Sequence, residues 1–175
     1  MSFETTNYLL ALGTLGLQAS TLVLLAVYVL RKRIPDLEDI AMPISRWSML
    51  IALLVAFGAS AMTLIHSHYF GLPPCDLCWW QRIFLYPQVV IFALALYKRE
   101  RSIADYSLVL SALGLGVALY HHALQMFPSG TLPCPAQGVS CSQILFLEFG
   151  FITYPMMGAT LFAFLIVLML FSRPR

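Results

Sequence analysis

The stretch PPCDLCWWQRIFLYPQVVIFALALY, residues 73–97, joins a pair of cysteines to a long apolar run. Cys75 and Cys78 are three residues apart and stand directly before the apolar residues, with two tryptophans and Arg82 close behind them. A helix that begins here would carry two thiols at its mouth and would be long and apolar enough to enter a bilayer. The stretch therefore predicts thiol chemistry at the end of a membrane-spanning helix.

The composition of the whole chain agrees with a membrane protein. The 175 residues are 60% hydrophobic and only 10% charged, and their mean hydropathy is +0.82. Soluble domains carry about 25% charged residues. The length fits one bundle rather than two domains. The net charge of +2 is too small to indicate a nucleic-acid partner, so we expect none.

Five apolar runs divide the chain. A bilayer core requires about 20 apolar residues in a helix, and lipid offers no partner for unpaired backbone groups. We therefore predict an all-α fold, a polytopic membrane helix bundle. The runs are Tyr8–Leu30, Ser48–Ile65, Trp79–Tyr97, Tyr106–Phe127 and Phe149–Phe171.

The basic residues predict the topology, because positively charged loops stay in the cytoplasm. Nine of the ten Lys and Arg residues lie between runs one and two, between runs three and four, or after run five, and only Arg82 lies elsewhere. With five spans these three regions share one side. We expect the C-terminus to be cytoplasmic, the N-terminus to be outside, and all four cysteines to face outside, where disulfides persist.

The front of the chain predicts an uncleaved anchor. No Lys or Arg precedes the first run, which is also too long for the apolar part of a signal peptide. The segment Pro35–Pro43, which mixes acidic and apolar residues, fits a short helix at the cytoplasmic surface and a solvated linker equally well.

The Cys75-x-x-Cys78 motif favours redox chemistry. At a helix N-terminus, backbone amides and nearby cations stabilise a thiolate. Arg82 follows Cys78 by four residues, so both side chains lie on one helix face. The alternatives are a structural disulfide or half of a zinc site, since zinc also uses Cys-x-x-Cys pairs. We expect no metal, because the second cysteine pair has a different spacing and no histidine close by.

The second pair, Cys134 and Cys141, lies in a stretch rich in proline and glycine, which predicts an irregular surface loop. A disulfide between them is feasible, although sequence alone does not establish a pairing. An exposed disulfide in such a loop suits thiol exchange. A loop staple is the alternative, since staples are the usual extracellular role.

Two further residue types are candidates for ligand binding at this end. Arg82 is ionisable at a membrane mouth, which indicates function, although a snorkelling arginine is the alternative. His121 and His122 end the fourth run on the same side, and one of them could donate a hydrogen bond to a ligand near Arg82. Histidines at a wet interface are the alternative.

These motifs together resemble the DsbB family, especially its BdbC-type branch. The likeness covers about residues 45–175 and rests on several stretches in a fixed order. They are CDLCWWQRI (75–83) followed by Tyr86-Pro87, HHALQ (121–125), Pro133-Cys134 with GVSCS (138–142), and FGFITYP (149–155).

The resemblance implies a quinone-linked thiol oxidase of the bacterial inner membrane, which reoxidises a DsbA-like thioredoxin-fold protein. By matched position, Cys134 would form the mixed disulfide with that partner, and Cys141 would pass the electrons to Cys75. Cys78 would meet the quinone, ubiquinone or menaquinone, as a thiolate. Arg82 would bind the quinone, and His121 would assist.

The family pattern has four helices, so residues 1–44 would add an N-terminal transmembrane helix and cytoplasmic linker to a four-helix domain, residues 45–175. The pair spacing of the loop cysteines is closer to the BdbC type. A vitamin K epoxide reductase type of enzyme is one alternative, but there the loop pair precedes the Cys-x-x-Cys motif. A non-enzymatic membrane protein with structural disulfides is the other.

Overall fold

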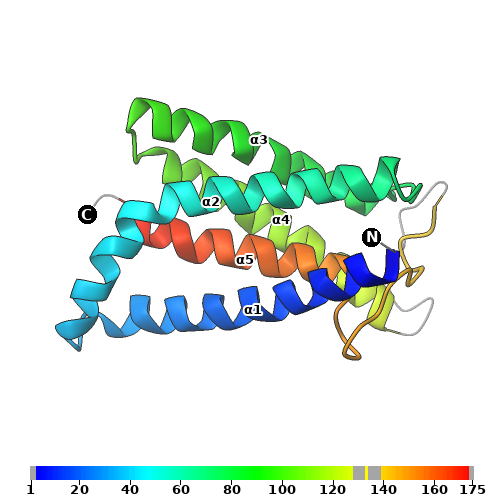
Figure 1. Cartoon of the computed structure of the whole chain (residues 1–175), viewed down its shortest axis with the longest axis horizontal. Coiled ribbons are helices and arrows are strands. Elements are labelled where there is room, and N and C mark those ends of the chain that lie inside the picture. The colour runs from blue at the N-terminus through cyan, green and yellow to red at the C-terminus, as the bar shows by residue number, and fades with distance from the viewer. Residues whose placement is uncertain (1–2, 128–132, 134–138, 174–175) are drawn as a thin grey trace.

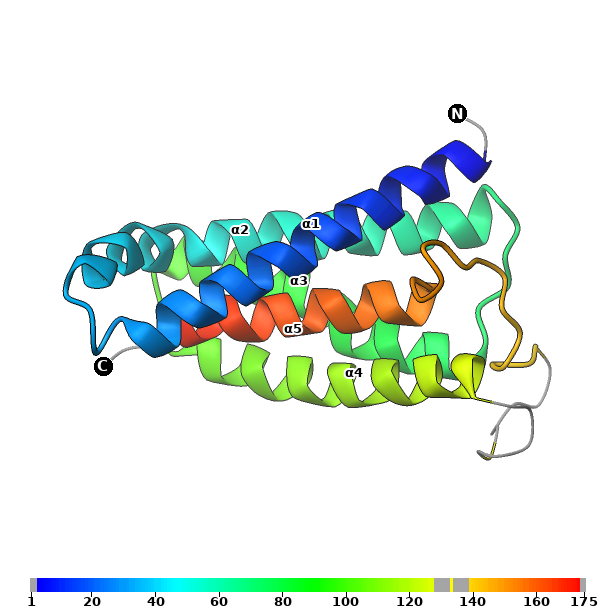
Figure 2. The same cartoon turned by 90° about the horizontal axis from the view of Figure 1, so that it is seen from below.

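The computed structural model describes residues 3–127, 133 and 139–173 (Figures 1 and 2). Within these ranges the chain forms five helices, each long and apolar enough to cross a membrane, which confirms the all-α polytopic bundle. The helices are α1 (Phe3–Leu30), α2 (Asp36–His68), α3 (Asp76–Lys98), α4 (Ile103–Met126) and α5 (Tyr154–Ser172).

Two helix boundaries differ from the apolar runs. The helix α2 begins at Asp36, so the segment 35–43 forms its first turns rather than a linker. Pro43 lies inside this helix, where a proline removes a backbone hydrogen bond and bends the axis, and the first turns of α2 lie at an angle to the rest in Figure 1. The fifth run begins earlier than α5, because residues 148–152 form a tight turn.

That turn explains why α5 begins only at Tyr154. The backbone N–H of Ile152 donates to the carbonyl of Glu148 at 2.9 Å, and Phe149 and Gly150 both have positive φ, 53° and 79°. Thr153 then caps the helix, with its side chain accepting a hydrogen bond from the N–H of Met156. Pro155 lies in the first turn, where proline is tolerated, so it does not kink α5.

The helix α5 is the centre of the bundle. In its apolar stretch 67% of the residues are buried, against 17–28% in the other four helices. It packs closely on α4, because Gly114 leaves room for the Phe162 ring: a Cβ at Gly114 would lie 2.5 Å from that ring. The outer helices keep many exposed apolar side chains, which suits a surrounding of lipid.

Between α3 and α4 a polar cluster is buried and fully bonded. The Gln88 side-chain oxygen accepts hydrogen bonds from Ser107 at 2.7 Å and Ser111 at 3.1 Å. Its amide nitrogen donates to the carbonyl of Phe84. Such interhelical bonds fix the rotation of one membrane helix against the next.

The two ends of the bundle differ in chemistry. The start of α1, the end of α2, the start of α3, the end of α4 and the start of α5 lie together at one end (Figure 1). The cysteines of the described residues lie there. The connections α1–α2 and α3–α4 and the end of α5, which carry the basic clusters, lie at the other end, where Arg173 pairs with Asp105 at 2.6 Å.

Candidate active site

The two cysteines of the Cys-x-x-Cys motif begin α3. After α2 the chain turns at Gly71, whose φ is +66°, and runs through two prolines to Cys75. Cys75 is the N-cap of α3, with extended backbone, and Cys78 is the third residue of the helix. Their Sγ atoms are 3.0 Å apart and hydrogen-bonded. The pair thus lies at the positive end of the helix dipole, as the sequence predicted.

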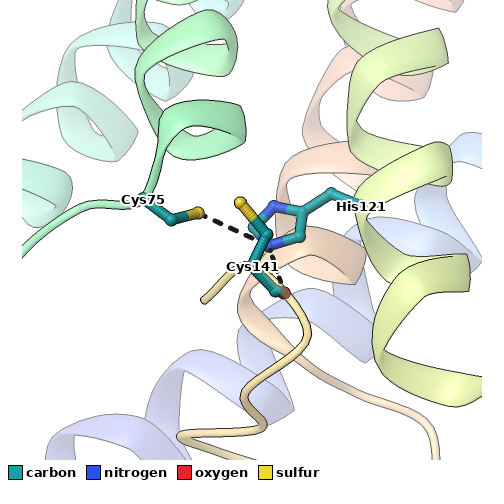
Figure 3. A group of neighbouring side chains, drawn as sticks. All are labelled: Cys75, His121 and Cys141. Carbon is teal, nitrogen blue, oxygen red and sulfur yellow. Dashed lines mark hydrogen bonds between the residues drawn. The ribbon is translucent and has the colours of Figure 1, made fainter. Parts of the chain in front are cut away.

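Cys141 approaches Cys75 from the loop before α5. Figure 3 shows Cys75, His121 and Cys141 pointing toward one another from three segments: the start of α3, the end of α4 and the loop. The two sulfurs and a ring nitrogen of His121 all lie within 4.8 Å of one another. All three residues are buried. The sulfurs of Cys75 and Cys141 thus lie close enough for a small movement to allow a disulfide bond between them.

His121 holds this cluster together. Its Nε2 is 3.1 Å from the carbonyl oxygen of Cys141 and 3.7 Å from the Sγ of Cys75. Its Nδ1 is 3.0 Å from the side-chain nitrogen of Gln81. A carbonyl only accepts hydrogen bonds, so Nε2 carries the proton and a neutral ring accepts from Gln81 at Nδ1. His121 therefore aims an N–H at the Cys141 carbonyl and the Cys75 sulfur.

The same protonation disfavours a metal site here. Cys75, His121 and Cys141 are donors that zinc accepts. A metal requires a free ring lone pair, however, and both ring nitrogens of His121 are engaged in hydrogen bonds that leave none facing the sulfurs.

Cys75 is held as a thiol. The hydrogen bond to the Cys78 sulfur and the burial of the side chain raise the pKa of Cys75 from 9.0 to about 12, although His121 opposes this. The raised pKa keeps Cys75 in the thiol form near neutral pH, in which it can donate a hydrogen bond to the Cys78 sulfur. The two sulfurs of one motif are thus chemically different.

Arg82 is anchored on α2. Its guanidinium donates to the backbone carbonyl of Thr63 at 3.0 Å and, by a short hydrogen bond, to the hydroxyl of Ser67. It also lies 5.3 Å from the centre of the Trp79 ring, a cation–π distance. Arg82 does not simply snorkel outward, since it bridges α3 to α2.

A cavity of about 410 Å³ opens beside Cys78. Its walls are mostly aliphatic and come from α1, α2, α3 and α5. A few polar side chains converge at one part of it, which is the usual character of a site for a small apolar ligand with polar ends. These polar residues are Thr63, His66, Ser67, Gln81, Arg82, His121 and Tyr154, and the other polar side chain of the lining, Thr14, comes from α1.

The structure brings most of the sequence-predicted residues together. Cys75, Cys78, Arg82, His121 and Cys141 all lie at one end of the bundle, and Cys78, Arg82 and His121 line the same cavity. The remaining predicted residue, Cys134, lies outside the described residues. His122 points elsewhere, since its Nδ1 is 2.9 Å from the Thr153 hydroxyl.

Several residues of the site were not predicted. Gln81 stands inside the motif, yet its role depends on His121, which is 40 residues away. Thr63 and Ser67 become visible only once α2 packs against α3. His66 and Asn7 bond to each other across α1 and α2, with 3.0 Å between His66 Nε2 and Asn7 Oδ1. Asn7 directly precedes the first apolar run, and nothing in the sequence indicates which residue its side chain contacts.

Comparison with known proteins identifies the family. The family model described as "Disulfide bond formation protein DsbB" matches residues 45–172. The chain belongs to the DsbB family. A "Probable disulfide formation protein C 2" of Bacillus anthracis is 34% identical over 126 residues, which is 72% of this chain and 90% of that protein.

Other members of the DsbB family are similar over the same part. The "SPbeta prophage-derived disulfide bond formation protein B" of Bacillus subtilis (strain 168) is 38% identical over 66% of this chain and 77% of its own length. A "Probable disulfide formation protein" of Chlamydia trachomatis is 40% identical over 66% of this chain and 84% of its own length. No solved structure matches the chain.

Membership in the DsbB family makes this chain a multi-pass membrane protein of disulfide bond formation, a disulfide-forming oxidoreductase. The family match begins at residue 45, so it leaves α1 and the first turns of α2 outside.

Proposed function

We propose that this protein oxidises a reduced DsbA-like thioredoxin-fold protein and passes the electrons through two cysteine pairs to a membrane quinone. One observation carries the proposal: the Cys75–Cys78 pair stands between Cys141 on one side and an apolar cavity on the other. A pair with a soluble exchange partner on one side and an apolar ligand on the other can link an aqueous and a lipid-borne substrate.

The cavity fits a quinone by its chemistry. Quinone carbonyls accept hydrogen bonds, and the polar part of the cavity is rich in donors, with the Arg82 guanidinium beside the Gln81 amide. The aliphatic walls suit an isoprenoid tail. A bound quinone, ubiquinone or menaquinone, would supply an acceptor for two electrons and two protons. Arg82 would hold it and Cys78 would face it, while His121, whose ring nitrogens are already hydrogen-bonded, would form part of the cavity wall.

The exchange steps proposed here take the role of Cys134 from the family resemblance, and the nearness of Cys141 to Cys75 supports the transfer between the pairs. A thiolate of the partner attacks the Cys134–Cys141 disulfide, forms a mixed disulfide with Cys134 and releases Cys141. Cys141 then attacks Cys75, so that a Cys75–Cys141 bond forms, the Cys75–Cys78 bond breaks and Cys78 leaves as a thiolate. The second partner thiolate releases Cys134 as the partner disulfide forms. Cys134 then resolves the Cys75–Cys141 bond.

His121 assists two of these steps. Its N–H is directed at the Cys75 sulfur, where it stabilises the negative charge that develops when Cys134 resolves the Cys75–Cys141 bond and Cys75 is released. Its bond to the Cys141 carbonyl holds the loop in reach of Cys75. The reduced pair then has its proton on Cys75 and its charge on Cys78, and it loses two electrons to the acceptor as the Cys75–Cys78 bond re-forms.

The proposal includes a topology and a division of the chain. The cysteine end would face outside the bacterial inner membrane, with the N-terminus outside and the C-terminus cytoplasmic, because the basic clusters lie at the opposite end. Residues 1–44 would be an added transmembrane helix together with the connection and the first turns of α2, and residues 45–175 the thiol oxidase domain. A C-terminal reporter enzyme that works only outside the cytoplasm would be inactive, and activity would contradict the topology.

The function is tested with the purified full chain, a reduced thioredoxin-fold donor and a quinone. We expect quinone reduction that is lost on replacing Cys75, Cys78, Cys134 or Cys141 with serine. Thiol trapping in cells provides a second test. If quinone is depleted, catalytic pairs accumulate in the reduced form, whereas purely structural disulfides stay oxidised.

A further inference from the structure

The helix α1 lies outside the region that the DsbB family model matches, yet it is bonded into the bundle. It packs along α5 (Figures 1 and 2), and the Gln18 amide donates to the Thr160 hydroxyl at 3.0 Å. Near its start, Asn7 is buried among apolar neighbours, where an amide is costly unless it is bonded.

Asn7 joins α1 to two other helices. Its Oδ1 accepts a hydrogen bond from the Tyr154 hydroxyl of α5 at 2.9 Å and lies 3.0 Å from Nε2 of His66 on α2. His66 is three residues from Thr63 and one from Ser67, and these three side chains share one stripe of α2. Thr63 and Ser67 hold Arg82, so the Asn7 cluster stands beside the Arg82 anchor.

One face of α1 continues from this cluster along the cavity. The cavity-lining residues of α1 recur at helical spacing, and nearly all are apolar. They are Leu9, Leu10, Gly13, Thr14 and Leu17. Across the cavity α2 contributes the similarly apolar Val55, Gly58, Ala59 and Met62. The donors therefore lie at one part of the cavity, and an apolar channel between α1 and α2 leads away from them.

We infer that α1 is a wall of the quinone site, which contacts the isoprenoid tail and thereby sets the preference for tail length. The inference rests on the proposed quinone reduction. The quinone head lies at Arg82 and Cys78, and the tail lies against the Leu10–Leu17 face of α1. Asn7 is a positioning residue that holds α1 in register with His66 and Tyr154.

Two glycines make the inference testable without disturbing the fold. A Cβ added at Gly13 meets no atom within 4 Å, and the same is true at Gly16. Gly13 lines the cavity, whereas Gly16, on the same helix, does not. Either position therefore has room for a Cβ, and only Gly13→Leu would place a side chain at the wall of the space assigned to the tail.

The experiment measures quinone reduction by the full chain with a tail-less quinone and with one that carries four isoprene units. For Gly13→Leu we expect KM for the tailed quinone to rise about fivefold or more, since displaced methylenes each cost about fourfold in binding. KM for the tail-less quinone and both kcat values should change by less than about twofold. Gly16→Leu should match the parent with both.

A photoreactive quinone with an azide on its tail gives a readout that does not depend on turnover. We expect cross-links to residues 9–17 of α1, and fewer in Gly13→Leu than in Gly16→Leu. An active parent with no label on α1, or a Gly13→Leu variant that affects both quinones equally or neither, would overturn the role of α1 alone. A parent that reduces no quinone would overturn the proposed function and this inference together.

Discussion

Cys75 and Cys78 are separated by less than one helical turn, yet they lie in different surroundings. Cys75 is at the N-cap, buried beside His121 and the loop cysteine Cys141. Cys78 is inside the helix and lines an apolar cavity with Arg82. Their Sγ atoms are only 3.0 Å apart, so the pair joins the loop side of the site to the cavity side. One short motif can thus serve two substrates of opposite solubility.

The comparison predicts two kinds of complete loss. Cys75→Ser and Cys78→Ser should each lower quinone reduction by about 10³-fold or more, since the residues of such a unit act together. The two variants should differ in the disulfide-bonded species that accumulates. In Cys78→Ser the Cys75 thiolate can attack Cys141 of the Cys134–Cys141 disulfide and release Cys134, and no Cys78 is left to resolve the product. A Cys75–Cys141 disulfide should therefore be trapped, and peptide mass spectrometry detects it.

Cys75→Ser should accumulate no bond between Cys78 and Cys141, because Cys78 faces the cavity. If both variants trapped a disulfide with Cys141 to the same extent, the two sulfurs would be equivalent and the comparison would fail.

The raised pKa of Cys75 predicts slow alkylation of the reduced protein. A thiol with a pKa of about 12 instead of 9.0 has roughly 1,000-fold less thiolate near pH 8. Because the folded pKa is raised, the thiol form persists through neutral pH, and labelling should climb about tenfold per pH unit beyond pH 10. Rate-against-pH profiles of Cys75 in a Cys134→Ser/Cys141→Ser background measure this.

Replacing Cys78 with alanine in that background removes the main cause of the shift, so the profile should move to lower pH. Burial alone slows labelling without changing the shape of the profile. A plateau near pH 9 in the folded protein would show that Cys75 does not donate to Cys78.

Replacing Arg82 should weaken quinone binding in the cavity and leave the exchange between the two cysteine pairs unchanged. Arg82→Met removes a charge-assisted donor worth about 1.5–3 kcal/mol, which corresponds to a rise of roughly 10- to 100-fold in KM for quinone. Transfer of the disulfide from Cys75–Cys78 to the reduced loop pair, in one turnover without added quinone, should keep its parent rate. Equal losses in both measurements would mean that Arg82 supports the fold rather than the ligand.

Replacing His121 should slow the exchange between the two cysteine pairs, by a smaller factor than Arg82→Met raises KM for quinone. His121→Ala removes the hydrogen bonds to Cys141 and Cys75, and we expect the transfer between the pairs to slow about tenfold, or about 1.4 kcal/mol. His122→Ala is the matched control, because its imidazole bonds Thr153 instead. Rapid quenching with a thiol reagent measures the rate. If His121→Ala and His122→Ala changed the rate equally, His121 would have no specific role in the exchange.

The sequence predicts those features that depend on local pattern. Apolar length predicted five helices, and the proline pair before Cys75 placed the cysteines at a helix start. A short helix over Pro35–Pro43 was one of two interpretations of that segment, but its continuation through Pro43 into the second apolar run was not predicted. The beginning of α5 was missed because the turn at Phe149 and Gly150 is itself apolar.

The parts of the site that sequence did not predict depend on packing between distant segments. Arg82 bonds to Thr63 and Ser67 only because α2 lies against α3. Gln81 and His121 meet across 40 residues, and Asn7 meets Tyr154 across 147. No spacing rule connects such residues, since their contacts are set by the rotation of whole helices.

The most direct test of the account is a single turnover without the loop pair. The Cys134→Ser/Cys141→Ser protein is reduced, freed of reductant and mixed with quinone in the absence of oxygen. The account predicts one quinol per chain and a new Cys75–Cys78 disulfide, because Cys78 of this pair lines the cavity. If no quinol formed while the reduced parent protein made it, the electrons would leave by another route and the account would be contradicted.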